Sequence, residues 1–87
     1  MDMEEMVGLS VKHNVSDLHL CSNSPPRWRR LGHLESAPFP VPDVEQLLKT
    51  WLNDEQQGAW RANGQVDFAV SMSSRQRLRA SAFNHIH

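Results

Sequence analysis

An acid, an imidazole and a thiol occupy alternate positions of the short stretch "VSDLHLCSNSPPRWRRLG", which runs from Val15 to Gly32. Asp17, His19 and Cys21 alternate with leucines, so in a strand they would share the face opposite the core. Side chains of these types occur in metal sites, in Cys–His catalytic sites and at polar interfaces. The stretch therefore leaves three possibilities open: a metal site, a catalytic site or one side of an interface.

The histidines and the cysteine lack the spacing of a metal site. A structural zinc site needs paired ligands close together, such as Cys-x-x-Cys. The chain has one cysteine, and its histidines are His13, His19, His33, His85 and His87. Only the last two are close together, and no third ligand accompanies His19 and Cys21. We therefore expect no metal site.

Neither a Cys–His nucleophile pair nor a nucleotide cradle is predicted. Side chains two positions apart on a strand lie roughly 7 Å apart, too far for a ready hydrogen bond between His19 and Cys21. A phosphate-binding loop has the pattern G-x-x-x-x-G-K-[ST]. The nearest stretch, "GAWRANGQ" from Gly58 to Gln65, has a wider glycine spacing and no lysine. We expect no catalytic residue and no bound cofactor, unless Asp17, His19 and Cys21 converge within hydrogen-bond reach.

Arginines gather in two short clusters of an otherwise acidic chain. The clusters are Arg27, Arg29 and Arg30 and, further on, Arg75, Arg77 and Arg79. The net charge is only −1, so no bulk attraction to nucleic acid is expected. One interpretation is a solvated sheet face, since surface charge usually contributes little. The other is that Arg77 and Arg79 face an acidic partner or a phosphate, which the planar guanidinium suits.

Hydrophobic periodicity predicts an α+β fold with the order α-β-β-β-α-α-β-β. We expect helices over residues 2–13, 42–52 and 53–63, and strands over residues 17–21, 27–31, 33–36, 66–72 and 77–83. Asn53 and Gln56 have the spacing of a capping box, and Gly64 fits the end of the third helix. The last two strands form a hairpin. The sheet is expected to be mainly antiparallel, with helices packed on one face.

Length and composition predict one cytoplasmic domain, residues 1–87. A single cysteine, Cys21, forbids an internal disulfide and fits a reducing compartment. The acidic opening "MDMEEMVGLS" is unlike an export signal, and no apolar run reaches the length of a membrane span.

Four motifs together resemble the N-terminal domain of the PilT-type pilus retraction ATPases of the secretion ATPase superfamily. They are "VSDLHL", "PPRWRRLG", "VDFAVS" and "RLRASAFN", in the order and spacing of that family. Ser81 stands where the family has asparagine and His85 where it has glutamine, and the final "HIH" differs from the family's continuation. The resemblance covers essentially the whole chain.

This resemblance implies a PAS-like N-terminal domain without catalytic residues of its own. Family members continue into a RecA-like ATPase domain, absent from this chain, and form hexamers that bind ATP and Mg between the domains. In that family, ATP hydrolysis moves the two domains against each other, and this movement drives pilus retraction and twitching motility at an inner-membrane platform protein. The resemblance therefore also implies peripheral membrane attachment through partners. Arg77 and Arg79 would face the nucleotide, while Asp17, His19 and Arg29 would lie at a domain or subunit interface.

Two rival functions come from other classes. A free-standing PAS-like sensor or protein-interaction module predicts an apolar cavity beneath the sheet. A small enzyme requires Asp17, His19 and Cys21 to converge. Only the motor-domain hypothesis predicts a natural chain that continues into a phosphate-binding loop.

Overall fold

The computed structural model of the chain describes residues 1–73 and 76–84. Its elements are α1 (Met3–Lys12), β1 (Val15–Cys21), β2 (Arg27–Arg30), β3 (His33–Ser36), α2 (Val44–Leu48), α3 (Asp54–Asn63), β4 (Gln65–Ser73) and β5 (Gln76–Phe83). The expected element order and the α+β class are confirmed. His85 and His87, which entered the metal hypothesis, and Arg75 lie outside the described residues.

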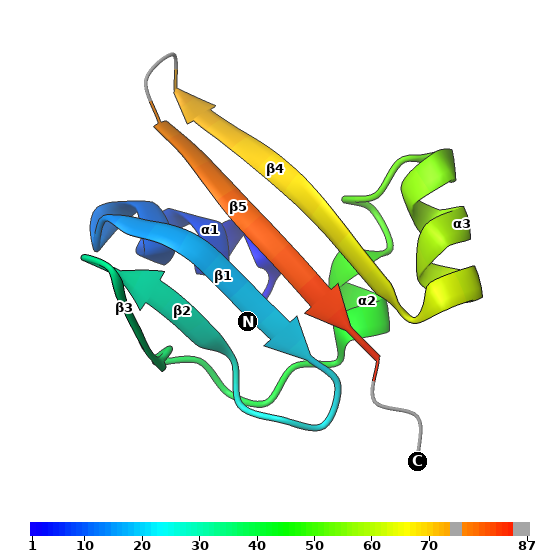
Figure 1. Cartoon of the computed structure of the whole chain (residues 1–87), viewed down its shortest axis with the longest axis horizontal. Coiled ribbons are helices and arrows are strands. Elements are labelled where there is room, and N and C mark those ends of the chain that lie inside the picture. The colour runs from blue at the N-terminus through cyan, green and yellow to red at the C-terminus, as the bar shows by residue number, and fades with distance from the viewer. Residues whose placement is uncertain (74–75, 85–87) are drawn as a thin grey trace.

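The strands form one five-stranded sheet in the order β3-β2-β1-β5-β4 (Figure 1). The pairs β1–β2, β2–β3 and β4–β5 are antiparallel, and the last of these is the expected hairpin. The central pair, β1–β5, is parallel. The sheet is therefore mixed, with the antiparallel pairs in the majority.

The hydrophobic core lies between one face of the sheet and the helices α1 and α2. Figure 1 shows both helices behind the sheet, while α3 lies beside β4. Leu18 and Leu20 of β1 and Ala80 of β5 are fully buried, as the alternation predicts. Further buried core residues are Met3, Met6, Val7, Trp28, Val44, Leu48, Phe68 and Leu78. The side chains that alternate with these are left on the opposite face of the sheet.

Side-chain caps fix the start of the two longer helices. Asn53 and Gln56 form the expected capping box of α3, and the helix ends at Gly64, whose φ is 69°. Asp2 and Glu5 form a second capping box at α1, in which the Glu5 amide donates to Asp2 at 2.9 Å. These bonds satisfy amides that a helix leaves unpaired at its start.

The predicted helix over residues 42–52 is wrong in its length, since α2 begins at Val44 after the cap Asp43. The apolar residues follow a helical spacing, but α2 ends at Leu48 and the chain continues as a turn. The Trp51 amide donates to the Leu48 carbonyl at 3.0 Å. This hydrogen bond spans three residues, as in a 3₁₀ turn, instead of the four residues of an α-helix. Leu52 is still buried, so this turn satisfies the same apolar pattern that a longer helix would.

Candidate functional site

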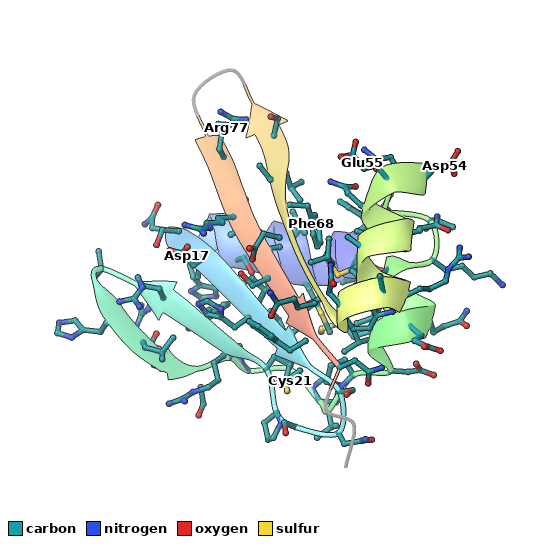
Figure 2. The ribbon with its side chains drawn as sticks, turned by 45° about the vertical axis from the view of Figure 1, so that its right-hand side comes forward. Asp17, Cys21, Asp54, Glu55, Phe68 and Arg77 are labelled. Carbon is teal, nitrogen blue, oxygen red and sulfur yellow. The ribbon has the colours of Figure 1, made fainter. Side chains whose placement is uncertain are left out.

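Within residues 1–73 and 76–84, no helix covers the second face of the sheet, which we call the open face. In Figure 1 it is turned toward the viewer, with α1 and α2 behind it. By strand alternation it carries Asp17, His19, Cys21, Arg27, Arg29, Asp67, Ala69, Arg77, Arg79 and Ser81. Figure 2 shows Asp17 and Cys21 toward the two ends of β1 and Arg77 at the start of β5. All five residues predicted from the sequence as site residues lie on this one face.

Asp17 lies between two arginines in a row across the strands. It pairs with Arg29 of β2 on one side and with Arg79 of β5 on the other. The Arg29 Nε atom is 4.0 Å from Asp17 Oδ2, a long contact between partly exposed groups. Such exposed ion pairs contribute about 0–1 kcal/mol, so this pair orients the side chains more than it stabilises the fold.

A β-bulge at Ser16 sets the direction of Asp17. The β1–β2 register shifts between Val15 and Asp17, which leaves Ser16 as an extra residue. The Ser16 hydroxyl donates to Asp17 Oδ2 at 2.8 Å and lies 3.3 Å from the Arg29 carbonyl oxygen. The bulge thus places the Ser16 hydroxyl, a hydrogen-bond donor from the same strand, next to the Asp17 carboxylate.

The next row along the sheet contains His19. His19 pairs with Arg27 of β2 and with Ser81 of β5, and Ser81 pairs with Asp67 of β4. The Ser81 hydroxyl donates to Asp67 Oδ1 at 2.7 Å, and Ser81 is buried. The Asp67 carboxylate therefore has a hydrogen-bond donor within the sheet, while the Arg27 side chain remains exposed.

Among the residues that the structure describes, three arginine side chains of the open face have no partner. Arg27, Arg77 and Arg79 are exposed, and within residues 1–73 and 76–84 their guanidinium groups make neither ion pair nor hydrogen bond. Arg27 belongs to β2 and the other two to β5, so unpaired positive charge flanks β1 on both sides. Planar guanidinium groups with free donors are suited to carboxylates and phosphates.

Arg30 does not belong to this patch, although it is adjacent to Arg29 in sequence. Its Nε donates to Glu35 Oε1 at 2.7 Å, and the Trp28 Nε1–H donates to the same oxygen at 2.9 Å. The hydrogen bond from Arg30 and the weaker one from Trp28 hold the pKa of Glu35 below its ordinary value of 4.5. The cluster of arginines in the sequence is thus divided between the open face and this β2–β3 contact.

We expect Glu35→Gln to flatten the acid limb of the stability profile. Because the folded pKa of Glu35 is lowered, its stabilising contribution is complete above about pH 4.5 and is lost as the pH falls through the folded pKa. The free energy of unfolding of the wild type should therefore fall more steeply below pH 4.5 than that of the variant. Urea unfolding at a series of acidic pH values measures this. Glu55→Gln, at an exposed carboxylate on α3, is the control and should keep the wild-type slope.

The structure gives no catalytic or metal constellation in the part of the chain that it describes. Asp17 bonds to Ser16 and contacts Arg29, and no hydrogen bond joins it to His19 or joins His19 to Cys21. Across those same residues, no group of three His, Cys, Asp or Glu side chains could hold a metal ion. None of the helices placed there is long and apolar enough to cross a membrane.

Sequence reasoning did not single out Arg27 as a site residue. The strand alternation places it on the open face, but only the observed register brings it next to His19. Both residues, together with Cys21 and Phe83, line a surface hollow at this end of the sheet. Register depends on pairing between distant segments, which alternation within one strand does not specify.

Comparison with known proteins extends the sequence resemblance to the fold. No family model matches the chain. The uncharacterized protein YggR of Escherichia coli (strain K12) is 62% identical over 87 residues, which are 100% of this chain and 27% of YggR. The type IV pilus retraction ATPase PilT of Pseudomonas aeruginosa is 31% identical over 97% of this chain and 25% of PilT. A crystal structure of the pilus retraction motor PilT with bound ADP matches 95% of this chain and 25% of that chain, with 26% identity and a TM-score of 0.69.

The chain is PilT-like. Its fold matches the N-terminal domain of PilT, and the resemblance carried by the four motifs is confirmed. The chain spans about a quarter of the length of the relatives it matches. In this PilT-like fold, "VSDLHL" and "RLRASAFN" are the two central, parallel strands, and "PPRWRRLG" supplies β2. The fourth motif, "VDFAVS", lies in β4, so all four motifs supply strands that carry the open face.

Proposed function

We propose that the chain serves as the non-catalytic N-terminal domain of a hexameric pilus-retraction or secretion ATPase. In this account a RecA-like domain of the same protein binds ATP and Mg and hydrolyses the nucleotide. The domain described here couples hydrolysis to pilus retraction and twitching motility through contacts with that domain and with neighbouring subunits. The protein would act in the cytoplasm, against an inner-membrane platform protein.

One observation carries this proposal: on the open face, arginines on both sides of β1 are without a partner among the described residues. Burying an arginine without a partner is costly, so a surface that meets this face must supply acids or phosphates. Arg77 and Arg79 lie on the same strand. In our proposal their guanidinium groups face the nucleotide phosphates. In the same proposal, the contact with a domain or a neighbouring subunit involves Asp17, His19 and Arg29.

No observation favours the PAS-like sensor over this function. A hollow between α2 and α3 contacts Trp60, but its lining also includes Glu45, Lys49 and Arg61. An apolar small-molecule ligand would have to desolvate these charges. The small-enzyme hypothesis requires the convergence of Asp17, His19 and Cys21, and the structure gives them no mutual hydrogen bond.

The thiol of Cys21 reports directly on whether the open face becomes covered. Cys21 is a free, partly exposed cysteine on this face. We would replace the matching quarter of Pseudomonas aeruginosa PilT by this chain, with every other cysteine changed to serine. Alkylation by a maleimide should be about tenfold slower in the chimera than in the isolated chain, because reactivity depends on access to the thiol.

The control is Cys21→Ser combined with Gly58→Cys. Gly58 lies on the exposed side of α3, where an added Cβ meets no atom within 4 Å. Its alkylation rate should be equal in the chimera and in the isolated chain. Equal rates at Cys21 as well, in a folded chimera, would mean that the open face stays uncovered and would overturn the proposal.

A further inference from the structure

A hollow at one end of the open face combines basic, hydroxyl and apolar side chains. It lies where β1 and β5 end, beside the loop over residues 22–26, and Figure 2 shows Cys21 at this end of β1. We call it the Phe83 hollow. Its lining includes His19 and Cys21 of β1, Ser24 of the loop, Arg27 of β2, Ser36 of β3 and Phe83 of β5.

The polar side of the Phe83 hollow consists of hydrogen-bond donors. The Arg27 guanidinium and the hydroxyl groups of Ser24 and Ser36 make no hydrogen bond among the described residues. Arg27 pairs with Ser36 on one side and with His19 on the other, so the imidazole lies in the same row. A planar guanidinium beside hydroxyl groups is suited to a carboxylate.

No acid of the described residues lines the Phe83 hollow. The acids of the open face already have partners, because the Asp17 and Asp67 carboxylates each accept a hydrogen bond from a serine. Hollows around α2 and α3 differ in this respect, since their linings include Glu45 or Glu55. The described part of the chain therefore does not balance the positive charge of this hollow, and the complementary ligand is an anion.

The apolar side of the hollow is an exposed aromatic ring. Phe83 is 40% exposed, whereas the other aromatic side chains of the sheet, Trp28 and Phe68, are buried. On the open face Phe83 pairs with Cys21, whose thiol is partly exposed. Covering such a ring with apolar surface is favourable. The hollow therefore suits an occupant that carries an apolar group as well as an anion.

The ring and the guanidinium are too far apart for one small anion to reach both. Phe83 belongs to β5 and Arg27 to β2, and β1 lies between these strands. Two strand spacings are roughly 10 Å. An extended peptide places the side chains of residues i and i+2 on one side, about 7 Å apart. The long arginine side chain covers the remaining difference, so two side chains of one peptide segment match the hollow.

We propose that the Phe83 hollow binds an extended protein segment with an acidic side chain two positions from an aromatic or large aliphatic one. The carboxylate accepts hydrogen bonds from Arg27 and the neighbouring hydroxyl groups, while the apolar side chain packs on Phe83. This inference rests on the proposed function, in which the segment belongs to the domain or subunit that covers the open face. It names the chemistry of that contact at one end of the face.

An NMR titration of the isolated chain with a small peptide tests the site. The probe is phenylalanyl-alanyl-aspartate, capped at both ends so that the aspartate side chain is its one carboxylate. We expect saturable shifts of the Phe83 and Cys21 signals. Replacing the aspartate by asparagine, or the phenylalanine by alanine, should weaken binding at least about fivefold, because each change removes one of the two anchoring contacts.

A pair of arginine variants tests the charged contact from the side of the chain. Arg27→Gln should weaken binding of the unaltered probe at least about fivefold, since it removes the guanidinium from the hollow. Arg61→Gln makes the same change at an exposed position on α3 and should leave the affinity unchanged. Both variants must give the wild-type circular dichroism spectrum, and the peptide series decides alone if Arg27→Gln does not.

Three results would overturn this inference: no saturable shift, equal binding of all three peptides, or equal binding by wild type and a folded Arg27→Gln. Inorganic phosphate that binds as tightly as the probe would also overturn it, because the hollow would then be a simple anion site. Alkylation of Cys21 in the chimera reports separately on the proposed function. If Cys21 stays reactive there although the isolated chain binds the probe, the proposed function fails and the peptide site stands.

Discussion

Leu18→Ala should destabilise the fold by about 2–5 kcal/mol, the range for truncating a buried leucine. Leu18 is 0% exposed and lies in the central strand β1, between Trp28 of β2 and Ala80 of β5. Ala80 is small, so the neighbouring strand cannot fill the cavity that the lost methyl groups leave. A chain of this size has limited stability to lose, so a large fraction of the variant should be unfolded at room temperature.

Urea unfolding followed by circular dichroism measures this loss. The matched control is His19→Ala, the next residue of the same strand, whose side chain lies on the open face. It should change the free energy of unfolding by less than about 1 kcal/mol, since it removes no core contact. Equal losses in the two variants would contradict the assignment of the two faces of the sheet.

Arg79→Glu should reduce ATP turnover on the order of a hundredfold in the PilT chimera described above, the scale for losing one donor to a transition-state charge. Arg79 is exposed and unpaired among the described residues, so the reversal breaks no internal contact that the structure records. The proposal places its guanidinium toward the nucleotide phosphates, where a carboxylate would repel them. The same reasoning applies to Arg77, which lies two residues earlier on the same face.

The control for this prediction is Arg61→Glu on α3, which makes the same change of charge away from the open face. Its guanidinium lies 3.3 Å from the Gln57 side-chain oxygen. Turnover should stay within about twofold of the unmodified chimera, as for surface substitutions outside a site. Light scattering must give the same mass for both variants, so that turnover and assembly are separated. Equal turnover in both variants would remove Arg79 from the nucleotide site.

Local signals in the sequence were enough to predict the elements. Alternation of leucine and alanine with polar residues predicted β1 and β5, and the capping residues Asn53 and Gly64 fixed the ends of α3. These signals work because each depends on residues only a few positions apart. The length of α2 was not predictable in the same way, because a turn that buries Leu52 satisfies the same apolar spacing.

Contacts between distant segments could not be predicted. The parallel pairing of β1 with β5 joins residues 17–21 to residues 79–83, and no property of either strand specifies its neighbour. The same limit applies to the site. The sequence indicated that Asp17, His19, Arg77 and Arg79 share an outward face, but only the register places Asp17 between Arg29 and Arg79.

The central claim is that this PilT-like chain is the coupling domain of a motor whose ATPase domain lies elsewhere in the protein. The most direct test measures ATP turnover and mass, by light scattering, for the isolated chain, for the chimera and for PilT lacking the matching quarter. The account predicts hexamers with ATP turnover from the chimera, and neither property from the isolated chain. If the chimera folds but turns over ATP no faster than PilT without this region, the coupling function is wrong.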